Sequence, residues 1–252
     1  MAKGKKAGRD ARTALVTGAG GGVGGALVRT LAKRGWRVIA IVHAYADAQT
    51  LNGIDNIEAF RLDLDNGDHV TKWARELLKD KVDRLDLLAH VAAVGPVGPA
   101  AQATDALWTE TLAVNVVAPA LLTAGLLPAL RAAKGTVVFV NSGAGERGVV
   151  GHAVYAASKH ALRGYADTLR LEETANGVRV STIYPGPIDT RMLLQDTTLP
   201  EGAGPDDFIR PQSVADAIVW LADATGDVHV TNLDLRPREE LAAKYARKRD
   251  AK

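Results

Sequence analysis

The sequence predicts an α/β fold, a single doubly wound domain whose parallel sheet of about seven strands has helices on both faces. Short aliphatic and β-branched runs recur along the chain, and longer stretches with helical periodicity separate most of them. Strands that alternate with helices form right-handed βαβ units and a parallel sheet. No Pro/Ser-rich linker or shift in composition divides the 252 residues, so one domain is expected.

The strand-like runs are rich in Val, Ile and Leu, and they are Thr13–Thr17, Arg37–Val42, Ile57–Leu62, Leu85–His90, Thr136–Asn141, Val178–Tyr184 and Val228–Leu235. The helix-like stretches are 22–34, 66–80, 104–134, 153–176 and 212–223. The connection 44–54 has room only for a brief helix. The domain is therefore expected over 13–240. Within it, 187–211 is irregular and rich in Pro and Gly, and a loop of that length in a compact domain is usually functional, so we expect a substrate loop there.

Composition is that of a soluble globular protein, with 47% hydrophobic and 24% charged residues. Cysteine is absent, which excludes disulfides and a thiol nucleophile and fits a reducing cytoplasm. The basic start is not followed by a long apolar run, so no secretory signal is expected. The segment Leu112–Leu130 is almost long enough to span a bilayer, but Asn115, Pro119 and Pro128 interrupt it, so a buried helix is predicted and no membrane partner.

The net charge of +2 is unevenly distributed. Residues 1–12 and 241–252 each carry five Lys or Arg against one Asp, so an acidic body lies between two basic tails. Nucleic-acid binding through these tails is one reading. Disordered, solvated tails are favoured, because Tyr245 is their only aromatic residue.

A glycine-rich turn follows the first strand directly and precedes a helix. It reads Thr17-Gly18-Ala19-Gly20-Gly21-Gly22-Val23-Gly24-Gly25. Glycines let the backbone approach a pyrophosphate, and the helix amino terminus supplies N–H donors. This context predicts a dinucleotide-binding site, with a flexible loop that binds nothing as the alternative.

Tyr155 and Lys159 are four residues apart in a helix-like stretch and therefore share one face. The pKa of a phenol is near ~10. A cation about 4 Å away favours the phenolate by roughly 4 kcal/mol, which lowers the pKa by about three units. Tyr155 is then usable as an acid and base near neutral pH, and Ser142, thirteen residues earlier, is placed to hold a substrate oxygen. An exposed Tyr–Lys pair without function is the alternative.

Further motifs occur at characteristic spacings. The glycine turn also reads TGxxxGxG, Asp63-Leu64 follows the third strand, and Pro185-Gly186-Pro187-Ile188-Asp189-Thr190 matches PGxxxT. In this order, together with Asn115, Ser142 and the YxxxK pair, they resemble the short-chain dehydrogenase/reductase family of about 250 residues, from Thr13 to Leu235.

The resemblance implies a Rossmann-type fold and an oxidoreductase, a carbonyl reductase or alcohol dehydrogenase, that moves a hydride between a nicotinamide cofactor and a ketone or alcohol. It implies four catalytic residues, which are Asn115, Ser142, Tyr155 and Lys159. Ser142 and Tyr155 would bind the carbonyl oxygen, Tyr155 would transfer the proton, Lys159 would hold the ribose, and Asn115 would anchor a relay water. The implied cofactor-binding residues are Gly18, Gly20, Gly22, Val23, Gly24, His43, Asp63, Leu64, Ala92, Tyr155, Lys159, Pro185, Gly186, Ile188 and Thr190. A homodimer or homotetramer is expected by resemblance alone, and no metal.

The sequence departs from the family pattern at two places. His90-Val91-Ala92-Ala93 replaces the NNAG segment, and we expect His90 to be a buried residue satisfied by backbone rather than a catalytic base. The second strand ends in Val42-His43-Ala44 with no acid before Asp47, so no carboxylate is expected to repel a 2′-phosphate, which favours NADP(H) over NAD(H).

The expected walls of the substrate pocket are 93–99, 143–152 and 192–209, which are mostly small or apolar and favour an uncharged small molecule. A dinucleotide-binding sensor or scaffold with little turnover is the alternative function, motivated by the altered NNAG segment and the basic tails. A serine hydrolase is excluded, because no G-x-S-x-G turn surrounds Ser142.

Overall fold

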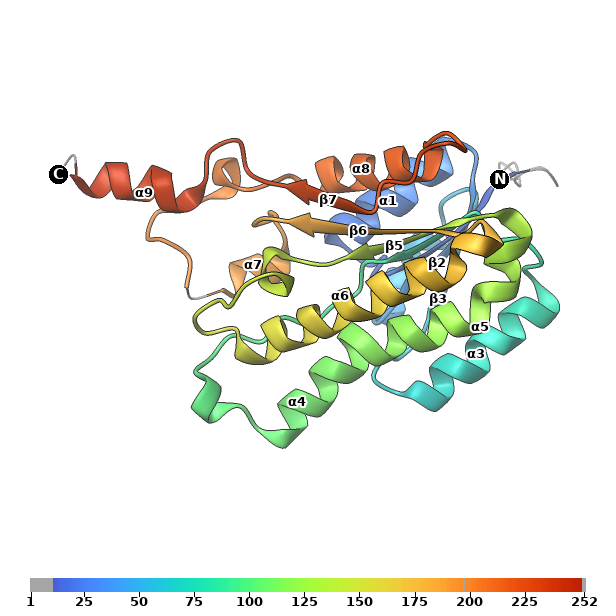
Figure 1. Ribbon diagram of the computed structural model, residues 1–252, viewed down its shortest axis with the longest axis horizontal. Coiled ribbons are helices and arrows are strands. Elements are labelled where there is room, and N and C mark those ends of the chain that lie inside the picture. The colour runs from blue at the N-terminus through green and yellow to red at the C-terminus, as the bar shows by residue number, and fades with distance from the viewer. Residues whose placement is uncertain (1–10, 197, 251–252) are drawn as a thin grey trace.

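The computed structural model describes residues 11–196 and 198–250, and it contains a seven-stranded parallel sheet with helices on both faces (Figure 1). The strands are β1 (Thr13–Thr17), β2 (Arg37–Val42), β3 (Ile57–Arg61), β4 (Leu87–His90), β5 (Thr136–Val140), β6 (Arg179–Pro185) and β7 (Asn232–Leu235). The α-helices are α1 (Gly22–Lys33), α2 (Tyr45–Leu51), α3 (Gly67–Asp80), α4 (Asp105–Leu112), α5 (Ala118–Ala133), α6 (Ala153–Glu173), α7 (Arg191–Leu194), α8 (Pro211–Asp223) and α9 (Leu241–Asp250). The predicted fold class is confirmed.

The strand order is β3-β2-β1-β4-β5-β6-β7, so the direction of winding reverses between β1 and β4. In open parallel sheets a ligand binds in the crevice outside the carboxyl ends of the strands at such a switch point. The glycine turn after β1 and the altered NNAG segment after β4 lie on the two sides of this point.

Successive residues of the central strands enter different cores, which explains why β1, β2, β4 and β5 are buried along nearly their whole length. In β2, Val38 and Ala40 pack in the core under α1 and α8, whereas Ile39 and Ile41 pack in the core under α3, α5 and α6. Both cores are needed to bury the sheet.

β7 is shorter than predicted because a side chain takes the place of its first backbone pairing. The imidazole Nε2 of His229 lies 3.0 Å from the Val180 nitrogen and 2.9 Å from the Val180 carbonyl oxygen, and Ser181 Oγ donates to the Val230 carbonyl at 2.6 Å. Ladder pairing with β6 therefore begins only at Thr182 and Asn232.

The apolar stretch Asp105–Ala133 comprises α4, a π-helical turn at Ala113–Val117, and α5. By length and composition it could cross a membrane, and 39% of its most apolar window is buried inside the protein. Leu122, Leu126 and Leu130 are fully buried against the sheet, while Val117 is exposed. The prediction of a buried helix thus holds for one face only.

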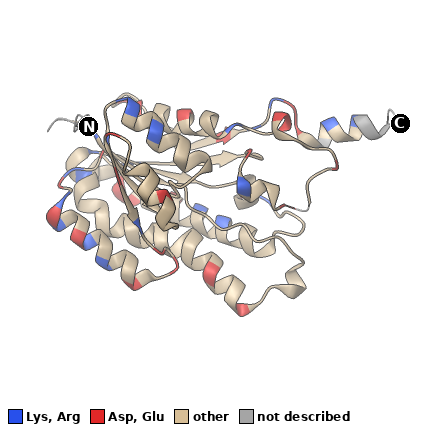
Figure 2. Cartoon of the chain, turned by 180° about the vertical axis from the view of Figure 1, so that it is seen from behind, with Lys and Arg blue, Asp and Glu red and all other residues tan. Residues whose placement is uncertain are grey.

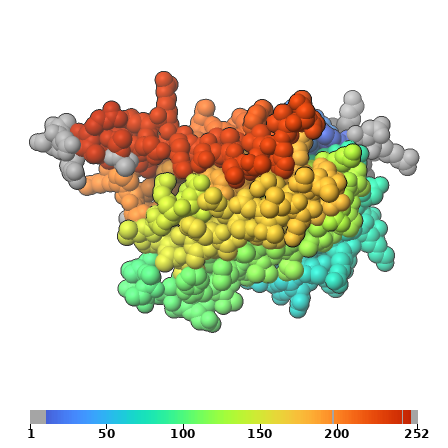
Figure 3. Space-filling view, in the orientation of Figure 1, coloured from blue at the N-terminus to red at the C-terminus, as the bar shows by residue number. Residues whose placement is uncertain are grey.

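The prediction of disordered tails is wrong where the structure describes them, and residues 1–10 lie outside the described part. Arg12 forms an ion pair with Asp223 at 2.8 Å and lies over the Trp36 ring. Residues 241–250 form α9, which projects at one end of the molecule and carries basic residues (Figures 2 and 3). Lys244 pairs with Asp207, and the Tyr245 hydroxyl donates to the same carboxylate at 2.8 Å, so tertiary contacts fix this helix.

Candidate active site

A cavity of about 990 Å³ opens at the carboxyl ends of the strands, at the switch point. It brings together most of the residues that the sequence singled out, which are Gly18, Gly20, Gly22, Val23, His43, Leu64, Ala92, Ser142, Tyr155, Lys159, Pro185, Gly186, Ile188 and Thr190. Three others, Gly24, Asp63 and Asn115, do not line it. Gly24 instead lets α1 pack close, because a Cβ there would lie 2.2 Å from the Gly18 carbonyl oxygen.

The glycine turn runs so close to its neighbours that a side chain would not fit at Gly18 or Gly20. Gly18 and Gly22 have φ of +68° and +52°, and a Cβ at Gly18 would lie 2.8 Å from the Ala92 nitrogen. Helix α1 begins without a side-chain cap, so the first N–H groups of the helix are available to an anion. The turn therefore fits the pyrophosphate of a dinucleotide.

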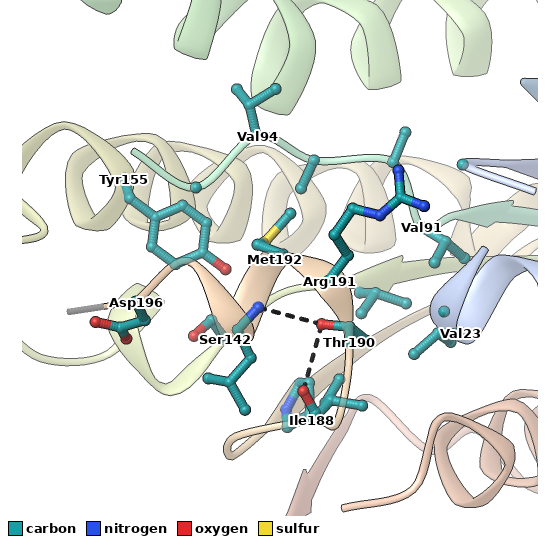
Figure 4. A pocket seen from close by; sticks show the side chains of 18 of the residues that line it. Val23, Val91, Val94, Ser142, Tyr155, Ile188, Thr190, Arg191, Met192 and Asp196 are labelled. Carbon is teal, nitrogen blue, oxygen red and sulfur yellow. Dashed lines mark hydrogen bonds between the residues drawn. The ribbon is translucent and has the colours of Figure 1, made fainter. Parts of the chain in front are cut away.

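Ser142 and Tyr155 project into the same part of the cavity (Figure 4). The Ala144 N–H donates to Ser142 Oγ at 3.2 Å, and Ser142 is hydrogen-bonded to the Tyr155 hydroxyl. Burial raises the pKa of Tyr155, and the hydrogen bond with Ser142 offsets only part of that rise. Two hydroxyl groups are thus positioned to bind one oxygen.

Lys159 is buried beneath Tyr155. Its Nζ donates to the Val140 carbonyl at 3.0 Å and lies 5.6 Å from the centre of the Tyr155 ring. Burial lowers the pKa of Lys159 to about 8. The prediction that Lys159 lowers the Tyr155 pKa is therefore wrong, because burial raises that pKa and Lys159 Nζ lies beside the ring, on the Val140 carbonyl.

Comparison with known proteins decides the family. A family model for short chain dehydrogenases matches residues 12–198. The chain belongs to the short-chain dehydrogenase family. It is therefore an oxidoreductase acting on CH–OH or C=O groups.

Individual relatives match over most of their length. An uncharacterized oxidoreductase, YmfI of Bacillus subtilis (strain 168), is 30% identical over 83% of this chain and 90% of its own. An acetoacetyl-CoA reductase of Allochromatium vinosum is 29% identical over 88% and 96%. The crystal structure of a metagenomic short-chain oxidoreductase in complex with NADP superimposes with a TM-score of 0.75 at 28% identity, covering 91% of this chain and 98% of that one.

Asn115, the fourth catalytic residue that the family resemblance implied, is hydrogen-bonded to a segment of the cavity wall. Its Oδ1 accepts from the Val94 N–H, and its Nδ2 donates to the Val94 carbonyl, both at 2.9 Å. Nδ2 also donates to Ser158 Oγ at 2.9 Å. Since both amide hydrogens are used inside the protein, the side chain of Asn115 positions the segment after β4.

His90 is buried and uncharged. Burial lowers the pKa of His90 to about 3, and the ring stacks on Phe139 with centroids 4.9 Å apart. Its Nε2 lies 2.8 Å from Thr123 Oγ1. The expectation of a backbone partner is therefore wrong, because the partner is a side chain. His90 does not line the cavity, which agrees with a structural role.

Beyond the end of β2 the cavity wall contains a carboxylate that the sequence reading did not assign to the site. Asp47, in the first turn of α2, lines the cavity, and a Cβ at Gly20 would lie 2.3 Å from its Oδ2. The expectation that no carboxylate is placed to repel a 2′-phosphate is therefore wrong. Asp63 does not line the cavity, because Arg61 binds its carboxylate at 2.8 and 2.9 Å.

The cavity wall contains Glu110 and Glu240, which the sequence reading did not name as site residues. Three further charged residues that it missed are Asp65, Arg191 and Arg236. Each follows a strand or the PGxxxT motif within a few residues, and this position is the signal that could have found them. Arg191 extends into the pocket from α7 (Figure 4). Asp196 lies 3.4 Å from His152 Nε2, which joins the substrate loop to the start of α6.

No group of three or more His, Cys, Asp or Glu that could hold a metal occurs among the described residues.

Proposed function

We propose that this dehydrogenase interconverts a ketone or aldehyde and an alcohol by hydride transfer with NADP(H), and that Tyr155 is the proton donor and acceptor. The observation that carries the proposal is the convergence of the Ser142 and Tyr155 hydroxyls in the cavity that also contains the glycine turn and Lys159. An acetoacetyl-CoA reductase among the relatives and NADP in a similar structure are consistent with this chemistry.

The nicotinamide ring supplies or accepts the hydride when the cofactor is bound. In reduction, Ser142 and Tyr155 donate hydrogen bonds to the substrate oxygen as negative charge develops there. Ser142 Oγ accepts from Ala144 N–H, and its own hydrogen, which in the structure is donated to the Tyr155 oxygen, would turn to the substrate oxygen. Tyr155 is a protonated phenol at neutral pH and can donate its proton, although burial raises its pKa and so weakens it as an acid.

Lys159 is the proposed source of the next proton. With its pKa near 8, it exchanges protons close to neutral pH. We also propose that Lys159 binds the ribose hydroxyls of the cofactor. A water that relays the proton past Asn115 would bind a carbonyl oxygen of this residue, because both hydrogens of its side-chain amide are donated to protein atoms.

The proposed cofactor preference depends on two residues near the expected adenosine site, one that would attract a 2′-phosphate and one that would repel it. His43 is exposed at the end of β2, where it can meet a 2′-phosphate, and Arg61 donates to its carbonyl. Asp47 acts in the opposite sense, because its carboxylate has no cationic partner among the described residues. We therefore propose a modest preference for NADP(H).

Tyr155→Phe tests the mechanism. With NADPH and a panel of ketones followed at 340 nm, the variant should lose at least about 100-fold in kcat, as general acid catalysis contributes about 10²–10⁴. Its affinity for NADPH, measured by fluorescence titration, should change less than about threefold. Tyr165→Phe on the same helix is the matched control. Equal turnover by native protein and Tyr155→Phe would contradict the assignment.

The same assay decides the alternative function, a sensor or scaffold, which predicts cofactor binding without turnover across the panel. The altered segment after β4 still contributes Ala92 to the cavity wall, so it does not obstruct the cofactor site. A cytoplasmic location and a homodimer or homotetramer remain predictions, which fractionation and light scattering would test.

A further inference from the structure

We infer that the substrate carries an anionic group, a carboxylate or a phosphate, that Arg147 and Arg236 bind. This inference rests on the proposed function and specifies the substrate of the same site. The sequence favoured an uncharged substrate, because the segments expected to form the walls are mostly small or apolar.

The two guanidinium groups converge beside Gly143, the residue that follows Ser142. A Cβ at Gly143 would lie 3.0 Å from Arg236 Nη1 and 3.7 Å from Arg147 Nη2. Arg147 belongs to the loop between β5 and α6, and Arg236 follows β7, so the fold brings together two cations from distant parts of the sequence. Both line the cavity that contains Ser142 and Tyr155.

Two cations at one point repel each other, and an anion between them relieves the repulsion. Arg236 has partial compensation, from Asp234 at 3.3 Å and Glu146 at 3.7 Å. The backbone N–H of Arg147 donates to the Gly143 carbonyl, whereas its guanidinium group has no ion-pair or hydrogen-bond partner among the described residues and is available to a ligand.

Asp196, another carboxylate of the cavity wall, already has hydrogen-bond partners. Asp196 accepts from Thr198 N–H at 2.8 Å and from Thr198 Oγ1 at 2.6 Å, and it faces His152. Glu240 also lines the cavity. Guanidinium groups bind carboxylate and phosphate oxygens in a bidentate manner, and a substrate whose carbonyl lies on Ser142 and Tyr155 can place such a group on Arg147 and Arg236.

Matched pairs of substrates test this inference and distinguish the two anion sources. For a carboxylate, 4-oxopentanoate and 5-oxohexanoate are compared with their methyl esters. For a phosphate, acetoacetyl-CoA is compared with acetoacetyl-N-acetylcysteamine. The native enzyme should favour the anionic member of at least one pair by about tenfold in kcat/KM.

Arg147→Gln and Arg236→Gln should each remove about tenfold of that preference through KM and leave the neutral member unchanged within about twofold. Glu146→Gln should strengthen the preference about twofold, because it removes a carboxylate that competes for Arg236. Arg238→Gln is the matched control, since Arg238 lies on the same segment as Arg236 but does not line this cavity.

Equal kcat/KM within every pair would overturn the inference, and so would an equal loss for both members in Arg147→Gln. If no compound is turned over, the proposed function fails, and calorimetry with 4-oxopentanoate and acetoacetyl-CoA decides the anion site. Binding of either compound to native protein but not to Arg147→Gln would support the inference, whereas equal binding or none would overturn it.

Discussion

The side-chain amide of Asn115 pairs with both backbone polar groups of Val94, accepting from its N–H and donating to its carbonyl at 2.9 Å each. The pairing copies that of a neighbouring strand, and it fixes a residue that lines the cavity to the π-helical turn between α4 and α5. Asn115→Ala would leave two backbone groups of Val94 and Ser158 Oγ without this partner. We expect unfolding free energy to fall by about 3 kcal/mol and kcat/KM to fall more than tenfold.

Urea denaturation and the carbonyl assay measure the two effects. Thr111→Val is the matched control, because the buried Thr111 hydroxyl on α4 has no hydrogen-bond partner within the described part of the chain. It should leave stability unchanged or raise it slightly. Asn115→Ala with native stability and activity would show that the pairing is dispensable.

The buried Lys159 should make the stability of the protein depend on pH. Its pKa is about 8 in the folded protein, below the value of 10.5 for a free lysine, so the unfolded chain binds more protons between these values. Unfolding free energy should therefore rise with pH from about 8 to about 10, by at most about 3 kcal/mol. Urea midpoints at pH 7, 8, 9 and 10 would show the rise in native protein and its loss in Lys159→Met. Identical slopes in the two proteins would contradict the burial of a titrating Lys159.

Substitutions of Asp47 and His43 should change the affinity for NADPH in opposite directions. Asp47→Asn removes an unpaired charge next to the glycine turn, and it should tighten NADPH binding about tenfold and alter NADH binding less than about threefold. His43→Ala should weaken NADPH binding only. Fluorescence titration of both cofactors measures these changes, with exposed Asp68→Asn as the control. A loss of NADH affinity alone in Asp47→Asn would instead assign Asp47 to the ribose hydroxyls.

The carboxyl-terminal helix α9 should detach from the protein when its contacts with Asp207 are removed. Asp207 accepts from Lys244 and from the Tyr245 hydroxyl, and these contacts hold the pKa of Asp207 well below its usual range. Asp207→Asn should release α9 and accelerate tryptic cleavage at Lys244 and Arg247 several-fold. The melting temperature should change little, because no α9 residue whose burial the structure describes belongs to either hydrophobic core. Unchanged cleavage would show that α9 is held by other contacts, and Asp206→Asn is the control.

Much of the fold could be predicted because local sequence specifies it. The strand runs are apolar on both faces, and the glycine turn contains residues with positive φ that other side chains rarely adopt. The Tyr155–Lys159 spacing and the position of Ser142 after β5 identified the centre of the candidate site. The start of β7 was not predictable, because His229 replaces a backbone partner from 49 residues away.

The sequence by itself determined the layers, the sheet and the motifs at the strand ends, since these depend on residues close together in the chain. Only the tertiary structure decided the electrostatics. It placed Asp47 against Gly20, directed Lys159 Nζ to the Val140 carbonyl, and brought Arg147 and Arg236 to Gly143. The energy of a charge depends on burial and on neighbours within a few ångströms, and both follow from packing between distant segments.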